Sequence, residues 1–161
     1  MKTAASLIMA LAAVTLVGCG FRLQGRTPLP APLKLTYVQP TDPQSDFVQG
    51  LRKALISSGA RLAKSSTEAS GVVRIVKDEV KRTVLSVSGS NTPREYEVTY
   101  TVRFSFSAGD KDLLPEQEVA LSRDYSFDET ILLAKEHEEA ILRESLARDL
   151  VGIVMRRLAS L

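Results

Sequence analysis

The sequence predicts an α+β fold: a two-layer sandwich with a mostly antiparallel four-stranded sheet and two helices on one face, in the order β-α-β-β-β-α. Residues 95–108 alternate between apolar and polar side chains, which indicates a strand with one buried face. Two segments, 41–59 and 131–160, repeat apolar residues at helical spacing. The helices are segregated from a run of three strands, and this segregation is typical of such sandwiches.

The N-terminus is excluded from this fold because it has the pattern of a targeting segment. A short basic start precedes the uncharged stretch 5–18. At about 14 residues this stretch is too short to span a bilayer, which takes about 20. A basic start, an apolar segment of this length and small residues at its end predict a secretory signal peptide over residues 1–18.

The only cysteine of the chain, Cys19, follows the signal segment directly, and "LVGC" resembles the bacterial lipobox. There the thiol receives a diacylglycerol, the chain is cut before the cysteine, and the new amine is acylated, with palmitate as a typical acyl chain. Two or three acyl chains make a lasting membrane anchor. Because Gly20 follows instead of the Asp that signals inner-membrane retention, we expect an outer-membrane location facing the periplasm. A plain signal peptide or a buried helix with a chance cysteine are the alternatives.

The mature chain divides into a tether and one domain. Residues 19–33 are expected to be the lipidated N-terminus and an extended, proline-rich tether, and 34–161 a single α+β domain. The domain begins with a strand over 33–39. The helix over 41–59 is expected to start at Asp42, with Pro43 in its first turn and Gly59 at its end.

The central strands follow this helix. In residues 72–87 the apolar alternation shifts phase near Val76, which predicts a bulge or a strongly twisted strand. A turn is expected over 88–94 and a loop over 108–115. The alternating strands are expected to bury these residues on one face: Tyr96, Val98, Tyr100, Val102, Phe104, Phe106, then Val119, Leu121, Tyr125 and Phe127.

The terminal helix is predicted to be amphipathic. Its apolar stripe is Ile141, Leu142, Leu146, Leu150, Val154 and Leu158, and its opposite side carries Glu138, Arg143, Arg148, Asp149 and Arg156.

Composition and motifs argue against several function classes. The chain has 21 Lys and Arg against 19 Asp and Glu, and this balance argues against bulk nucleic-acid binding. We find no nucleophile motif, phosphate-binding loop or clustered metal ligands. The only histidine, His137, lies in a charged helical stretch and is interpreted as solvated. We therefore expect no catalytic activity, no cofactor and no metal.

The segment "CGFRLQG" resembles the Cys-Gly-Phe-x-Leu-x-Gly start of the LptE family of lipopolysaccharide-assembly lipoproteins. The resemblance extends over the proline-rich tether, the first helix "DPQSDFVQGLRKAL", the valine-rich strand, the "REYEV" strand entry and the long terminal helix. The chain ends at Leu161, whereas some relatives carry a further polar tail, so nothing attributed to such a tail transfers.

The resemblance implies an outer-membrane lipoprotein that plugs the LptD barrel, helps it to assemble, and assists lipopolysaccharide transport to the cell surface. The implied partners are LptD, lipopolysaccharide and the outer membrane. The alternatives are a periplasmic scaffold lipoprotein that makes only protein contacts, and a carrier that encloses a lipid. The carrier needs a continuous apolar cavity, whereas the apolar face of 96–106 is expected to pack on the helices.

Basic side chains are the candidate ligand contacts under this resemblance. The phosphates of lipopolysaccharide call for Arg and Lys, which donate charge-assisted hydrogen bonds. Arg94 and Lys135 are the first candidates because they lie at predicted element ends, and Lys81 and Arg82 in the valine-rich strand are the next. The alternative for each of these four residues is a surface charge that serves only to keep the protein soluble.

Overall fold

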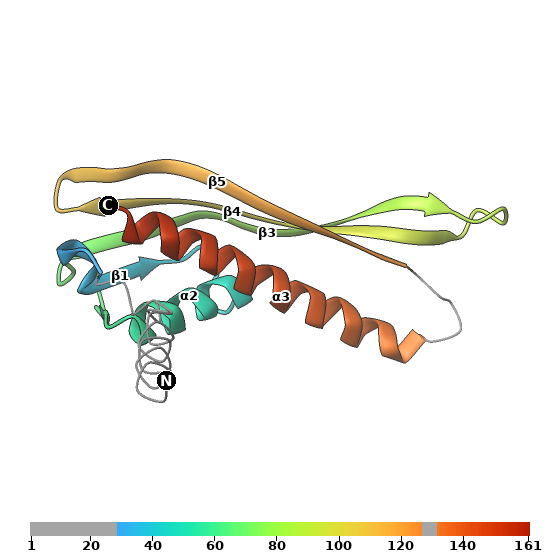
Figure 1. Ribbon diagram of the computed structural model, residues 1–161, viewed down its shortest axis with the longest axis horizontal. Coiled ribbons are helices and arrows are strands. Elements are labelled where there is room, and N and C mark those ends of the chain that lie inside the picture. The colour runs from blue at the N-terminus through green and yellow to red at the C-terminus, as the bar shows by residue number, and fades with distance from the viewer. Residues whose placement is uncertain (1–28, 127–131) are drawn as a thin grey trace, which may run out of the picture.

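The computed structural model of this chain describes residues 29–126 and 132–161, with side chains throughout except over 132–138. The predicted α+β architecture is confirmed. Helices α2 (Asp46–Ser57) and α3 (Leu132–Ala159) lie on the same side of one sheet (Figure 1). We call the sheet face that they cover the inner face and the opposite one the outer face. The long strands β3 (Gly71–Val87), β4 (Pro93–Ala108) and β5 (Lys111–Ser126) form an antiparallel meander.

The sheet differs from the prediction in strand number and direction. It has five strands in the order β2-β1-β3-β4-β5 and is mixed, not mostly antiparallel and four-stranded. The additional strand β2 (Arg61–Leu62) has two residues, which is too short for alternation to show. Strand β1 (Leu35–Gln39) runs parallel to both β2 and β3. Parallel pairing follows because helix α2 forms the crossover after β1.

The last residues of the expected tether belong to the packed domain. Ala31–Leu33 forms a short 3₁₀ helix, η2, and Leu33 is fully buried. Residues 1–28, including Cys19, lie outside the described residues.

Helix α2 begins later than the sequence predicts. Ser45, not Asp42, is its N-cap, because the Ser45 hydroxyl accepts a hydrogen bond from the Val48 amide at 3.1 Å. The Asp42 carboxylate instead accepts from the Gln44 amide in the preceding turn. At the other end, Gly59 has φ +98° and terminates the helix as predicted.

A bulge in β3 confirms the predicted phase change. The register with β4 shifts between Ile75 and Lys77, so that Val76 is an extra residue. Before the bulge, Val73 and Ile75 point to the inner face. After it, the even-numbered residues do so, because Asp78 pairs with buried Val102. The inner-face residues beyond the bulge are Asp78, Val80, Arg82 and Val84.

The predicted loop over 108–115 is wrong. Ala108 pairs with Lys111, which leaves a two-residue hairpin turn with Gly109 at φ +57°. Strand β5 therefore begins at Lys111. Pro115 is tolerated because β5 is an edge strand and the register shifts beside this proline.

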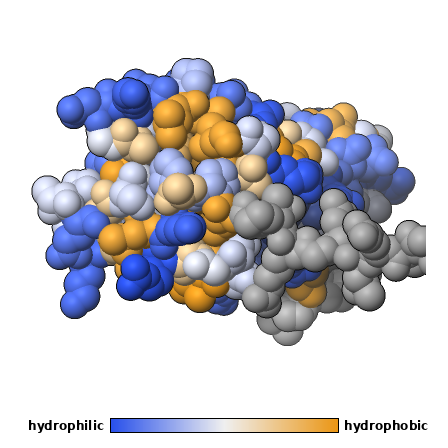
Figure 2. All heavy atoms as spheres, turned by 60° about the vertical axis from the view of Figure 1, so that its left-hand side comes forward, coloured by the Kyte–Doolittle hydropathy of each residue, from blue (hydrophilic) through white to orange (hydrophobic). Residues whose placement is uncertain are grey.

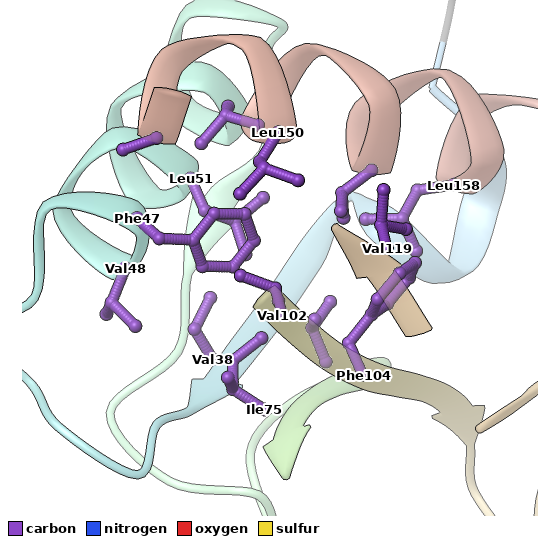
Figure 3. Packing of buried hydrophobic residues seen from close by; sticks show 14 of the residues in the cluster. Val38, Phe47, Val48, Leu51, Ile75, Val102, Phe104, Val119, Leu150 and Leu158 are labelled. Atoms are coloured by element: carbon purple, nitrogen blue, oxygen red, sulfur yellow. The ribbon is translucent and has the colours of Figure 1, made fainter. Parts of the chain in front are cut away.

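The core lies between the inner face and the two helices (Figure 3). Phe47 and Leu51 of α2 and Leu150 of α3 point toward Val102 and the neighbouring strand residues. From Val98 to Phe106 every second residue of β4 is buried, as its alternation predicts. The predicted stripe of α3 holds from Leu146 to Leu158. It is wrong at Ile141, which is 54% exposed. Phe127 lies outside the described residues.

A polar network fixes the N-terminus of α2 to the sheet. The Tyr100 hydroxyl donates to Asp78 at 2.7 Å and accepts from the Phe47 amide at 3.3 Å. The Ser45 hydroxyl donates to the other oxygen of Asp78. Thus the N-cap of α2, the first inner-face residue after the bulge and a buried tyrosine of β4 form one connected group.

The extent of the core can be tested with two valines of the inner face. Val102 is fully buried, whereas Val84 is 45% exposed. We expect Val102→Ala to lower the free energy of unfolding by about 2 kcal/mol, because it removes buried methyl groups and leaves a cavity. Val84→Ala should change it by less than about 0.5 kcal/mol. Urea denaturation measures both values, and similar losses in the two variants would contradict a core that ends before Val84.

The Tyr100 network predicts a loss of stability in alkali. Burial and the Asp78 carboxylate raise the pKa of Tyr100 above its ordinary value of 10.0. The stabilisation from the neutral phenol is complete below about pH 10 and decreases as the pH rises, because the unfolded chain ionises first. The stability difference between the wild type and Tyr100→Phe should therefore shrink between about pH 9 and about pH 11. An equal stability difference between the two proteins at both pH values would contradict this prediction.

Candidate functional site

The strands β3 and β4 extend well beyond β1 and α2 (Figure 1). We call the hairpin residues 80–98 the arm. Its tip is a tight turn in which the Ser88 amide donates to the Thr92 carbonyl at 2.7 Å and Asn91 has φ +61°. The turn chemistry predicted over 88–94 is therefore present, although β4 already starts at Pro93.

Two of the predicted basic contacts are exposed on the arm. Arg94 lies at the start of β4 next to the tip, and Lys81 lies on the outer face of β3 opposite Thr99. Among the described residues no acidic side chain lies within ion-pair distance of either one. Glu95, the acidic neighbour of Arg94, accepts a hydrogen bond from Ser86 at 2.7 Å. Both cations are thus available to an external anion.

Arg82 occupies a different environment from Lys81 and Arg94. It points to the inner face, where its guanidinium donates to the Glu139 carboxylate of α3 at 3.0 Å. The same guanidinium lies 4.9 Å from the centre of the Tyr96 ring. Hydrogen bonding to Tyr125 and the charge of Glu139 raise the pKa of Arg82. The structure therefore places Arg82 in contacts within the fold.

Tyr96 and Tyr125 complete this group. Their rings stack with centroids 5.6 Å apart, and the Tyr125 hydroxyl donates to Glu139 at 3.1 Å. Burial raises the pKa of Tyr125, and Glu139 adds to the increase. We call Arg82, Tyr96, Tyr125 and Glu139 the distal cluster. One signal in the sequence points to this cluster, namely the two tyrosines near the ends of adjacent inner-face patterns, but no signal identifies Glu139 as their partner on the helix.

The side of α3 opposite its apolar stripe is not fully solvated as predicted, because it forms two further ion pairs. Arg143 donates to Asp46 of α2 at 2.6 Å, and Asp149 accepts from Arg123 of β5 at 3.0 Å. Both side chains therefore face neighbouring elements. Lys135 lies within α3, but its side chain, like that of His137, lies outside the described ones.

Exposed apolar side chains concentrate on β3. Of the nine exposed large apolar residues of the described chain, five are in this strand at or beyond its bulge: Val76, Val80, Val84, Leu85 and Val87. At the opposite end of the molecule, shown in Figure 2, apolar patches are interrupted by hydrophilic side chains. The arm thus combines exposed cations with exposed apolar groups.

The outer face of the sheet is polar. Thr99 of β4 and Ser122 of β5 share a hydrogen bond of 2.8 Å across the strands. Arg103 pairs with Glu116 at 3.1 Å, and Lys77 with Glu79 at 3.0 Å. This face suits contact with water or with another polar surface.

Neither a metal centre nor a membrane-spanning helix is found in the part of the chain that the structure describes. Its His, Cys, Asp and Glu side chains form no group of three or more suited to hold a metal ion. Its helices lack an apolar stretch long enough to cross a membrane.

Comparison with known proteins gives concordant matches. Residues 33–158 match the family model described as LptE, lipopolysaccharide-assembly. The LPS-assembly lipoprotein LptE of Pectobacterium atrosepticum is 24% identical over 157 residues, which cover 97% of this chain and 85% of that protein. The protein of the same name from Photorhabdus laumondii is 25% identical over 150 residues, covering 91% and 82%.

Solved structures share the fold. The solution structure of a lipoprotein B from Nitrosomonas europaea has a TM-score of 0.72 at 25% identity, covering 88% of this chain and 91% of that one. The crystal structure of the rare lipoprotein B from Shewanella oneidensis has a TM-score of 0.68 at 21% identity, covering 78% and 94%.

Proposed function

Because this chain belongs to the LptE family of lipopolysaccharide-assembly lipoproteins, we propose that it plugs the LptD barrel in the outer membrane, helps that barrel to assemble and contacts lipopolysaccharide in transit. The arm is the observation that carries this proposal. It extends from the packed body and presents exposed cationic and apolar side chains together.

The outer face supports a position inside a barrel. The interior of an outer-membrane barrel is polar, and large barrels hold a plug in the lumen. A plug therefore needs a polar surface toward the wall, such as the Thr99–Ser122 and Arg103–Glu116 contacts supply. The longest strand, β3, has 17 residues, which corresponds to roughly 55 Å. This length exceeds the apolar band of a barrel, which is about 25 Å tall.

The tip of the arm supports contact with lipopolysaccharide. This ligand is an amphiphile with phosphates next to acyl chains, so a site for it combines cations with apolar surface. Arg94 is exposed, and the nearby Val87 is 53% exposed and pairs with Pro93. Lys135 is proposed as a second phosphate contact and Lys81 as an auxiliary one. Arg82 is the weakest of the four candidates because its guanidinium already has partners.

The N-terminus supplies the anchor in this proposal. Acylated Cys19 holds the protein at the outer membrane, facing the periplasm and the barrel lumen. The segment between Cys19 and the packed residue Leu33 is short, so the domain works close to the membrane.

Ligand contact is tested by charge reversal. We expect Arg94→Asp combined with Lys135→Asp to weaken lipopolysaccharide binding by about tenfold to a hundredfold, because two charge-assisted contacts become repulsive. The measurement is a titration of the purified protein, with circular dichroism to monitor the fold. Added salt should weaken binding of the wild type, because exposed charges are screened.

A matched control is Lys53→Asp combined with Lys111→Asp, which makes the same charge change on α2 and at the β4–β5 turn. Both residues are exposed and lie away from the arm tip. The control should retain the affinity of the wild type. If both double variants bind equally well with intact spectra, Arg94 and Lys135 are ordinary surface charges. Co-purification of a large barrel without lipopolysaccharide binding would instead support the protein-only scaffold.

The anchor is tested separately. Cys19→Ala should abolish incorporation of labelled palmitate and release the protein from the outer membrane, because no other cysteine is present to be acylated. Fractionation of cells and metabolic labelling measure both effects. Continued labelling and outer-membrane fractionation of the variant would show that the anchor lies elsewhere.

A further inference from the structure

The distal cluster joins four elements at one point. Arg82 comes from β3, Tyr96 from β4, Tyr125 from β5 and Glu139 from α3. The Glu139 carboxylate accepts from both Arg82 and Tyr125, at 3.0 and 3.1 Å. The Arg82 guanidinium also lies over the Tyr96 ring, which stacks on Tyr125. Each member therefore contacts two others, and Glu139 connects the strands to the helix.

The cluster lies at the outer edge of the core, where Val98, the β4 residue that pairs with Arg82, is still fully buried. On the inner face of β3, Val80 and Val84 flank Arg82 and are 38% and 45% exposed, whereas Ile75 nearer the body is 4% exposed. Helix α3 and the strands also separate in this direction (Figure 1). Apolar packing thus holds the base of the arm at Val98, and beyond that level the polar contacts of the cluster supply the constraint on the angle between the arm and α3.

We propose that the distal cluster is a positioning device that fixes the arm relative to α3, with Arg82 as its central residue. The inference rests on the proposed function in one respect: the arm carries Arg94 and α3 carries Lys135, so this constraint sets how the two proposed phosphate contacts are presented together. Arg82 then supports ligand binding without touching the ligand.

The chemistry of the cluster favours arginine at this position. A planar guanidinium donates to a carboxylate in its plane while its face lies over an aromatic ring. An ammonium group keeps the charge but loses the planar contact. We therefore expect Arg82→Lys to retain part of the constraint and Arg82→Gln to lose it.

The direct test measures the position of the arm. Spin labels are attached to Gly89→Cys at the tip and Glu144→Cys on α3, in the full chain carrying Cys19→Ser. An added Cβ at Gly89 meets no atom within 4 Å, so this label is tolerated. The distance distribution between the labels should be narrow in this background and should broaden in Arg82→Gln and in Glu139→Gln. The exchanged pair, Arg82→Glu with Glu139→Arg, should narrow it again.

A matched control is available in the Arg123–Asp149 pair. It also joins the sheet to α3 at 3.0 Å, and its side chains are 52% and 48% exposed, against 51% and 36% for Arg82 and Glu139. It lies beside the buried part of α3, so Arg123→Gln should leave the distribution unchanged. Equal broadening in Arg123→Gln and Arg82→Gln, or none in Arg82→Gln, would overturn the positioning role.

Lipopolysaccharide titration of the same variants separates this inference from the proposed function. We expect Arg82→Gln to weaken binding about threefold to tenfold, and the exchanged pair to restore it. Weak binding by an exchanged pair whose distribution is narrow would show that Arg82 contacts the ligand directly, which overturns the inference. A broadened distribution with unchanged affinity would uphold the positioning of the arm and contradict the proposed contacts.

Discussion

One extra residue in β3 determines which side chains reach the inner face. A one-residue shift in a strand moves every following side chain to the opposite face. With Val76 inserted, Ile75 packs in the core and Asp78 and Arg82 still point toward the helices. If the strand instead alternated regularly through Val76, Lys77 and Lys81 would face the helices, so both polar groups that hold the helices to the sheet depend on this bulge.

The two polar groups continue the attachment where the core ends. Nearer the body, Asp78 connects Tyr100 to the N-cap of α2. Farther out, Arg82 connects the three long strands to Glu139. A long hairpin that extends beyond its hydrophobic core needs such contacts to keep one orientation. In the proposed role that orientation presents a cationic tip to an anionic amphiphile.

The sequence was most informative where one physical preference dominated. The unbroken alternation of β4 predicted its buried face, and the phase change predicted the bulge at Val76. Prediction from the sequence failed where tertiary contacts determine the structure. Strand β2 is too short to show a pattern, and "GDKD" resembles a loop but contains a tight hairpin turn. Ile141 fits the apolar stripe but is exposed, whereas the next residue, Leu142, packs against the core.

The candidate site likewise combines features that the sequence predicts with features that only the tertiary structure shows. Arg94 was predicted from its place beside turn residues, and it is exposed on the arm. Arg82 and Lys81 are adjacent in sequence and equally basic, and only the strand register shows that one faces Glu139 and the other faces outward.

Photo-crosslinking in living cells tests most directly whether the arm meets lipopolysaccharide. A photoreactive amino acid replaces Val87 on the arm or, as a control, Ile56 on α2; the two side chains are 53% and 56% exposed. Contact through the arm predicts a lipopolysaccharide adduct at position 87 and none at position 56. Equal adducts at both positions, or none at position 87 while the protein remains bound to its barrel, would contradict it.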